Sequence, residues 1–144
     1  YLAQEGVELA RNLRDNDALN DGEWLETIVG AGCFGPSSGC AYHPLTGSPV
    51  GQYGACGDSC DPLAVKPNNV EGILTPTTAN PSSRFTRSVV VTETVQNREA
   101  SVVATVTWTV GSREYEVVVE DILLEVSRLE SRRQRALKQA NLLR

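Results

Sequence analysis

The residues of this chain best suited to chemistry are its four cysteines, which lie between Cys33 and Cys60 in a stretch rich in glycine, serine and proline. Cysteine thiolates can act as nucleophiles, bind zinc or oxidise to disulfides. Their spacing, C-x6-C-x15-C-x3-C, lacks the C-x2-C pairs typical of zinc sites, and the chain has one histidine, His43. The sequence therefore favours two disulfides that staple a long loop, with reduced structural thiols and a four-cysteine metal site as the alternatives.

The pairing of these cysteines has three solutions, since four cysteines allow three connectivities. Neighbours in sequence meet most easily, which favours Cys33 with Cys40 and Cys56 with Cys60. Local pairs close short loops and so restrict the unfolded chain less than distant pairs would. All four residues are predicted disulfide residues, and the other two pairings stay open.

Catalytic patterns are missing from the rest of the sequence. A nucleophilic cysteine needs a base, and His43 stands beside Tyr42 and Pro44 with no orienting partner in the sequence. The neighbouring acids Glu120 and Asp121 are better explained by solvation than by a shared proton. The chain also lacks a P-loop, a dinucleotide-binding glycine motif, G-x-S-x-G and H-E-x-x-H. We predict no enzyme, no catalytic residue, no metal and no cofactor.

An amphipathic helix is predicted at the start of the chain, from Tyr1 to Asp17. Its apolar residues recur near the helical period and form one stripe, made of Leu2, Ala3, Val7, Leu9, Ala10 and Leu13. Four polar residues fall on the opposite side, namely Gln4, Glu8, Arg11 and Asn12. A turn between Asp15 and Gly22 ends this helix. Residues 23–32 then form a short helix or strand, anchored by Trp24, Leu25, Ile28 and Val29.

Three strands are predicted at residues 84–95, 100–110 and 113–119, where apolar and polar residues alternate. Turns at 96–99 and at Gly111–Ser112 make them an antiparallel meander with one apolar face. The opening helix is the natural cover for that face, whose predicted core is Val106, Trp108 and Val117. Residues 30–61 are expected to lack regular structure. Four prolines in residues 62–84 predict an extended surface connection with one short strand at 72–75.

Charge is divided unequally along the 144 residues, which are enough for one domain. Residues 1–126 carry 7 Lys/Arg and 17 Asp/Glu, whereas residues 127–144 carry 6 Lys/Arg and 1 Asp/Glu. The acidic body argues against a nucleic-acid-binding surface, which requires clustered basic residues, and only the tail could bind polyanions, so no nucleic-acid partner is expected. Residues 127–144 predict a basic amphipathic helix that packs on the body, contacts an acidic neighbour or lies on a membrane surface. Its apolar stripe is Ile122, Val126, Leu129, Ala136, Ala140 and Leu143.

Two stretches carry a family resemblance. The segment YLAQEGVELARNLRDND, followed by an acidic turn and Trp24, resembles the lower part of the first helix of type IV pilin-like proteins. The run TVTWTVGSREYEV resembles the terminal hairpin of small minor pilins. The resemblance covers about residues 1–26 and 86–120. It implies an α+β fold in residues 1–126, with an N-terminal helix packed on a small antiparallel β-meander and a disulfide-stapled loop. The C-terminal amphipathic helix of residues 127–144 departs from this family, whose members commonly end soon after the last strand.

By this resemblance the chain is a structural subunit of an extracellular type IV pilus or pseudopilus-like filament, found in the filament or at the cell surface. Its partners would be other pilin-like subunits, in homo- or hetero-oligomers, through an assembly helix containing Leu2, Val7, Leu9 and Leu13. The family's apolar half helix would lie upstream of Tyr1, so we expect a trimmed subunit that meets a membrane only through that missing segment. The alternative is a stand-alone secreted binding module that uses the cysteine-stapled loop for recognition.

Overall fold

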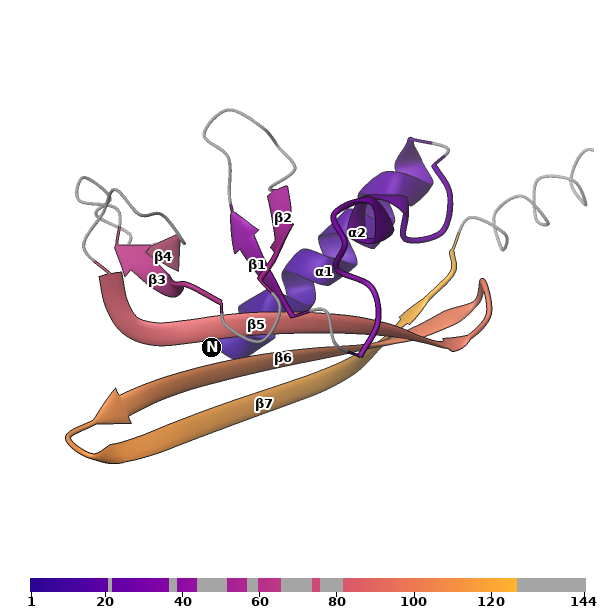
Figure 1. The fold of residues 1–144 in the computed structure, drawn as a ribbon. Coiled ribbons are helices and arrows are strands. Elements are labelled where there is room, and N and C mark those ends of the chain that lie inside the picture. Colours follow the sequence, from indigo (N-terminus) through magenta and orange to yellow (C-terminus); the bar gives the residue numbers. More distant parts are fainter. Residues whose placement is uncertain are drawn as a thin grey trace, which may run out of the picture.

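A computed structural model of the chain describes residues 1–20, 22–36, 39–43, 52–56, 60–65, 74–75 and 82–126. Helix α1 (Leu2–Leu19) lies across one face of an antiparallel sheet (Figure 1). The other elements are α2 (Glu26–Gly30), β1 (Cys40–His43), β2 (Gln52–Ala55), β3 (Pro62–Val65), β4 (Leu74–Thr75), β5 (Ser82–Val95), β6 (Glu99–Val110) and β7 (Arg113–Leu124). The predicted α+β class, with an N-terminal helix on an antiparallel sheet, is confirmed. The helix predicted for residues 127–144 falls outside the described residues.

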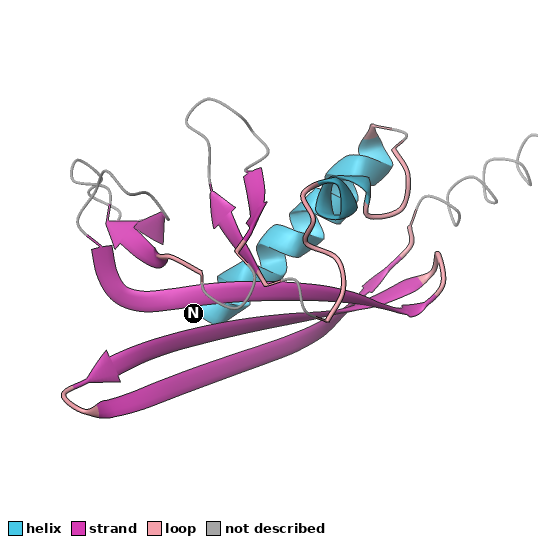
Figure 2. Ribbon diagram, viewed as in Figure 1, coloured by secondary structure: helices cyan, strands magenta, loops and turns pink. Residues whose placement is uncertain are grey.

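The three long strands β5, β6 and β7 form the predicted meander (Figure 2). Gly111 begins the two-residue turn between β6 and β7 with φ of 63°, a conformation that glycine adopts without steric cost. Strand β7 is longer than predicted because β6 begins at Glu99, which pairs with Leu124. Ile122 therefore lies in a strand, and its assignment to a helical stripe was wrong.

Short strands flank β5 on the side away from β6. Strand β1 pairs with β2 and, through Cys40, with Val89 of β5, while β3 pairs with β4 and β5. The expectation that residues 30–61 lack regular structure was wrong for β1 and β2. These strands have four residues each, too few for alternation to reveal them. Pro62 opens β3, a position in a strand where proline is tolerated.

The core lies between α1 and the meander. The buried face of α1 packs on the even-numbered row of β6 and the odd-numbered row of β5, and its members are Ala3, Gly6, Val7, Ala10 and Leu13. A Cβ atom at Gly6 would lie 3.1 Å from the Cβ of Ala104 and 3.1 Å from Cγ2 of Val89. Glycine therefore permits the close approach of helix and sheet. Leu2 and Leu9 are only partly buried, at the margin of this core.

The turn after α1 is held by Asp17. Its Oδ2 accepts a hydrogen bond of 3.0 Å from the backbone N–H of Thr27, and its Oδ1 accepts one of 2.5 Å from the Thr27 hydroxyl. Because the first N–H groups of a helix lack intrahelical partners, Asp17 caps α2 from the end of α1. Leu25 and Ile28 are buried as predicted, but Val29 is 50% exposed and does not anchor this segment.

Neither of the described helices combines the length and the hydrophobicity needed to cross a membrane.

Candidate functional site

The first candidate surface is the contact of α1 with the sheet, where a charged side chain is buried. Arg87 of β5 lies in the row of core residues between Phe85 and Val89 and is 2% exposed. Its Nη1 donates to the carbonyl oxygen of Leu2 at 3.1 Å and to Oε2 of Glu5 at 2.5 Å. A buried guanidinium requires such partners, because an unpaired buried charge is costly. Arg87 therefore joins β5 to the first turn of α1.

Two further arginines join α1 to β7. Arg11 forms ion pairs with Glu8, at 2.5 Å, and with Asp121 of β7. Arg14 donates a hydrogen bond of 2.8 Å to the carbonyl oxygen of Leu124. Sequence periodicity placed Arg11 on the solvent side of the helix, but in the structure it is half-buried at the edge over β7. Since the side chains of the Arg11 pairs are one-third to one-half exposed, each contributes about 0–1 kcal/mol and serves mainly to orient the helix.

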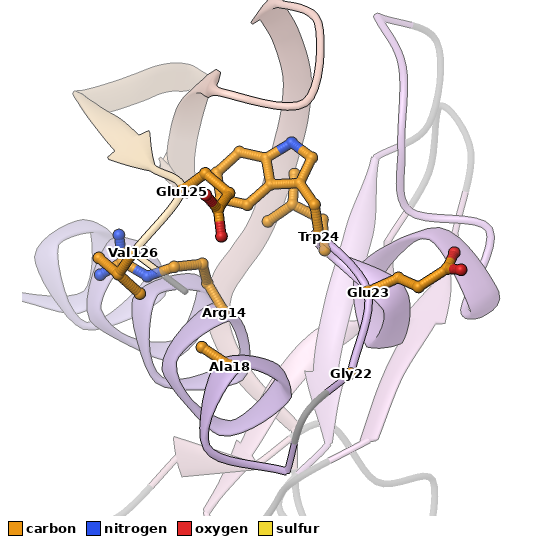
Figure 3. A pocket seen from close by; sticks show the side chains of 8 residues that line it. Arg14, Ala18, Gly22, Glu23, Trp24, Glu125 and Val126 are labelled. Atoms are coloured by element: carbon orange, nitrogen blue, oxygen red, sulfur yellow. The ribbon is translucent and has the colours of Figure 1, made fainter. Parts of the chain in front are cut away.

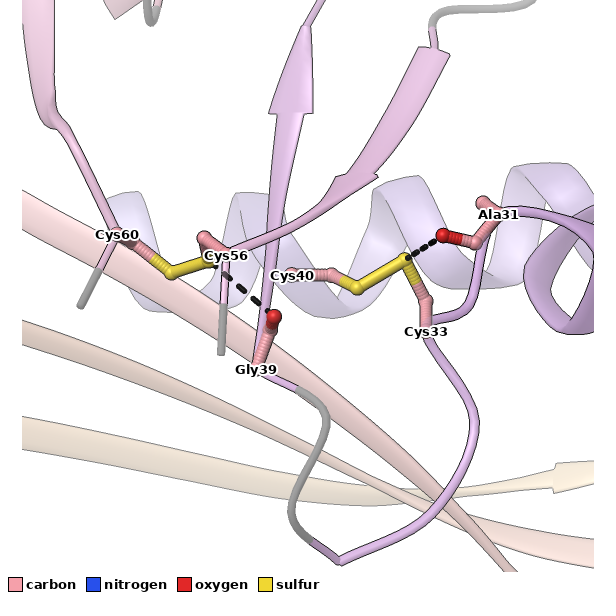
Figure 4. Close-up of a disulfide and its surroundings, with 6 residues drawn as sticks. All are labelled: Ala31, Cys33, Gly39, Cys40, Cys56 and Cys60. Carbon is pink, nitrogen blue, oxygen red and sulfur yellow. Dashed lines mark hydrogen bonds between the residues drawn. A yellow bond between two sulfur atoms is a disulfide. The ribbon is translucent and has the colours of Figure 1, made fainter. Parts of the chain in front are cut away.

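The second candidate surface surrounds the disulfides, which join Cys33 to Cys40 and Cys56 to Cys60 (Figure 4). The Cα–Cα distances are 5.5 Å and 4.8 Å, within the usual range for disulfides. This is the pairing of near neighbours. Cys33 and Cys40 are fully buried in the core cluster, so the first disulfide is a packing element as well as a staple.

Backbone contacts attach this disulfide segment to the sheet. The N–H of Gly35 donates to the carbonyl oxygen of Val91 at 2.8 Å, and Phe34 forms a bridge with the same strand residue. The N–H of Cys56 donates to the carbonyl oxygen of Gly39 at 2.9 Å. The disulfide Cys33–Cys40 and these backbone contacts therefore fix the start of β1 on β5.

A small open pocket lies where the end of α1 meets the end of the meander (Figure 3). Its volume of about 10 Å³ is room for about one water molecule. Trp24 contributes its indole ring, whose buried N–H has no acceptor among the described residues. The pocket is too small for an organic substrate. It is lined by Arg14, Ala18, Gly22, Glu23, Trp24, Leu25, Glu125 and Val126.

The predicted sheet core is only partly correct. Val106 is buried, and Trp108 is half-buried between the rings of Phe85 and Tyr115, at centroid distances of 5.8 Å and 5.6 Å. Val117 is 45% exposed, so its assignment to the core was wrong. It lies on the helix-facing side of the sheet, but the β6–β7 hairpin extends past α1, which leaves that end uncovered (Figure 1).

Exposed apolar residues gather on β7, Tyr115 and Val117 because the hairpin extends past α1, and the others because they lie on the face away from α1. Both faces of this strand contribute, with side chains between 41% and 54% exposed, and the residues are Tyr115, Val117, Val118, Ile122 and Leu124. We call this set the β7 apolar surface. It was not anticipated, because alternation in a sequence shows which residues share a face but not how far a covering helix reaches.

Three residues at the helix–sheet contact were also missed, although the sequence carried signals for two of them. Arg87 has the same parity as Phe85, Val89 and Val91, which places it on the buried face. Asp121 has the parity of Val117, which places it on the helix-facing side. Gly6 lies within the apolar stripe, but only the structure shows that it is the point of closest approach to Ala104.

Among the residues that the structure describes, no group of three or more His, Cys, Asp or Glu side chains is placed to hold a metal ion. The four cysteines are all in disulfides.

Comparison with known proteins found no matching family model, no matching curated protein and no matching solved structure.

Proposed function

We propose that this chain is a structural subunit of an extracellular filament of the type IV pilus or pseudopilus kind, acting in assembly and surface display. The observation that carries the proposal is the packing of α1 across the antiparallel meander, with the disulfide segment inserted between helix and strands in sequence. This is the arrangement that the resemblance of residues 1–26 and 86–120 implies.

The contacts of α1 suit a helix that connects a sheet to an assembly. Its ties to β5 and β7, through Arg87 and Arg11, hold it in one position on the sheet. A neighbour that binds the helix would therefore also position the sheet and the disulfide segment. In this proposal the partners are other pilin-like subunits, and the disulfide segment faces outward.

The two disulfides support a location outside the cytoplasm, since disulfides persist in oxidising compartments. The proposed location is the filament or the cell surface, and any membrane contact would come from an upstream apolar segment of the family type. The basic residues 127–144 would contact the acidic body of a neighbouring subunit, a contact that salt should weaken.

The test is to express the protein in its native host together with the codons upstream of Tyr1, and to label it for electron microscopy. We expect the label on filaments and in the membrane fraction. A matched control replaces the apolar upstream residues by serine and asparagine, which should leave the protein folded but absent from filaments. Deletion of residues 127–144, alongside a salt series, tests the proposed role of the basic tail.

The alternative is a secreted binding module. The observation that favours it is the disulfide scaffold itself, in which Cys33–Cys40 ties the start of β1 to the core beside β5, with β2 paired to β1 (Figure 4). An ordinary cleaved signal peptide upstream of Tyr1, with the intact protein absent from both membrane and filament fractions, would establish this alternative and refute the filament proposal.

A further inference from the structure

Strand β7 has an edge that no other described strand covers, since it pairs only with β6. Its even-numbered residues direct their backbone groups toward this edge. The N–H of Ile122 donates to its neighbour Asp121 at 2.7 Å rather than to β6, and the carbonyl oxygen of Leu124 accepts from Arg14. The N–H of Glu125, by contrast, donates back to Arg98. Residues 114, 116, 118 and 120 therefore present outward N–H and C=O groups in the pattern of an antiparallel edge.

This edge has only part of the usual protection against pairing. Natural edge strands carry charged side chains, lysine above all, or proline or bulges, or are very short. Five of the twelve residues of β7 are charged, but none is lysine or proline, and the register of β7 with β6 is continuous. It also carries the β7 apolar surface on both of its faces. Such a strand can accept another strand over residues 114–120, whereas pairing at residues 122 and 124 must displace the Asp121 contact and share the Leu124 carbonyl oxygen with Arg14.

We propose that β7 of a second copy of this chain pairs antiparallel with this edge, about a two-fold axis at Val119. Charge restricts the register, because like charges directly opposite each other destabilise a strand pair. An axis at Ile122 also opposes no two acids, but it pairs only residues 120–124 of the strand. Moving the axis to residue 118 places Glu116 opposite Glu120, and moving it to 117 places Glu114 opposite Glu120. At residue 120 or 121 the acid on the axis, Glu120 or Asp121, faces its own copy. An axis that lies between two residues places each even-numbered residue of one copy opposite an odd-numbered residue of the other. The backbone groups of the odd-numbered residues point toward β6, so the hydrogen bonds between the copies are lost.

In the register about Val119, every acidic residue from 114 to 125 faces a residue that is not acidic. Tyr115 of one copy lies opposite Leu123 of the other, and Leu123 is fully buried under α1. The hairpin end that α1 leaves uncovered in one copy thus lies beside the α1 of the other copy. The pair therefore brings a cover to the two residues of the β7 apolar surface that lie on the helix-facing side, Tyr115 and Val117.

A two-fold contact uses the same patch on both copies and closes on itself. It therefore cannot repeat subunits along a polar filament, and it is separate from the proposed filament contacts. Pairing through β7 and assembly into filaments can therefore fail independently, because pairing is tested with the chain of 144 residues alone in solution.

Cross-linking tests the register. Val119 residues of the two copies would form a non-hydrogen-bonded pair with Cα atoms about 4.5 Å apart, a distance at which a disulfide forms. The Val119→Cys variant should give a disulfide-linked dimer on air oxidation, since the native cysteines are all paired. The matched control is Val117→Cys, on the same face of β7. Its two copies would be about 13 Å apart, at about 3.3 Å per residue along the strand, and should stay unlinked.

A charge exchange tests the same pairing without new thiols. Val118 lies opposite Glu120 of the second copy and is 51% exposed, so a glutamate there is tolerated in one folded copy. Sedimentation should show a dimer for the wild type, a monomer for Val118→Glu, and a restored dimer for Val118→Glu combined with Glu120→Lys. Circular dichroism of Val118→Glu checks that the single variant folds.

Several results would overturn the inference. They are a wild type that stays monomeric at millimolar concentration, equal cross-linking of the two cysteine variants, and a dimer that Val118→Glu does not weaken. Loss of the dimer on deletion of residues 127–144 would assign the contact to the basic tail instead, and would equally refute pairing through β7.

Discussion

The buried ion pair between Arg87 and Glu5 makes a quantitative prediction about stability. The Arg87 side chain is 2% exposed, whereas that of Glu5 is 34% exposed. Substitution of Glu5 by glutamine keeps the size of the side chain and one oxygen acceptor but removes the negative charge. The guanidinium then stays in the core with only neutral acceptors, of which the carbonyl oxygen of Leu2, at 3.1 Å, is one.

The expected loss follows from burial. Breaking a fully buried ion pair from one side costs about 3–5 kcal/mol. Because one-third of the Glu5 side chain is open to water, solvent screens this pair, and the neutral acceptors retain part of the interaction. We therefore expect Glu5→Gln to lower the free energy of unfolding by about 2 kcal/mol. For a domain of 144 residues that corresponds to a fall in Tm of about 7 °C.

Urea and thermal unfolding, followed by circular dichroism, measure this loss. The Arg87→Met variant removes the buried charge itself and should cost less than Glu5→Gln. The double variant should resemble Arg87→Met alone, because once Arg87 is replaced the residue at position 5 has no guanidinium charge to neutralise. Glu8→Gln is the control, because its partner Arg11 is one-third exposed, and it should change stability by less than about 0.5 kcal/mol. Wild-type stability in Glu5→Gln, or strict additivity in the double variant, would refute the reasoning.

Three other measurements check the core and the disulfides. Gly6→Ala should destabilise the protein by about 1 kcal/mol, because crowding against Ala104 costs more than the gain in helix propensity, whereas Gly30→Ala, with open space around it, should be neutral or slightly stabilising in the same unfolding assay. Leu13→Ala should cost about 3 kcal/mol and Leu9→Ala less than half of that, since only Leu13 is fully buried; equal losses would place the core elsewhere. The intact protein should weigh four hydrogens less than its reduced form by mass spectrometry, and free thiols would contradict both disulfides.

The sequence predicted the elements that have strong periodicity. Residues 2–19 and 99–110 are long enough for their repeats of 3.6 and 2 residues to be read without ambiguity, and both elements were predicted within two residues of their bounds. The end of β7 was missed because the spacing of Ile122 and Val126 also fits a helix. Residues 120–124 form a strand because they pair with residues 99–103 of β6, whose backbone groups need hydrogen-bond partners.

The buried charge shows a different limit. The odd number of Arg87 places it on the apolar face of β5, but a charged residue at a buried position cannot be interpreted until its partner is known. Glu5 lies 82 residues away, and nothing local links the two. The uncovered end of the sheet also could not be predicted from local sequence. Its extent depends on where α1 begins to cover the strands, which the contact of Gly6 with Ala104 fixes. Contacts between elements decided these features, and local patterns do not contain them.

The three attachments of α1 also determine how the molecule carries a mechanical load. Glu5 holds β5, Gly6 sits against Ala104 of β6, and Arg11 holds β7, so each strand of the meander has its own attachment within the first three turns of the helix. A pull along the helix axis shears all three at once, because none can slide without displacing the others. A pull perpendicular to the sheet peels them apart one after another. Tension applied through α1 is therefore shared by the whole meander, and the resistance of the domain depends on the direction of the force.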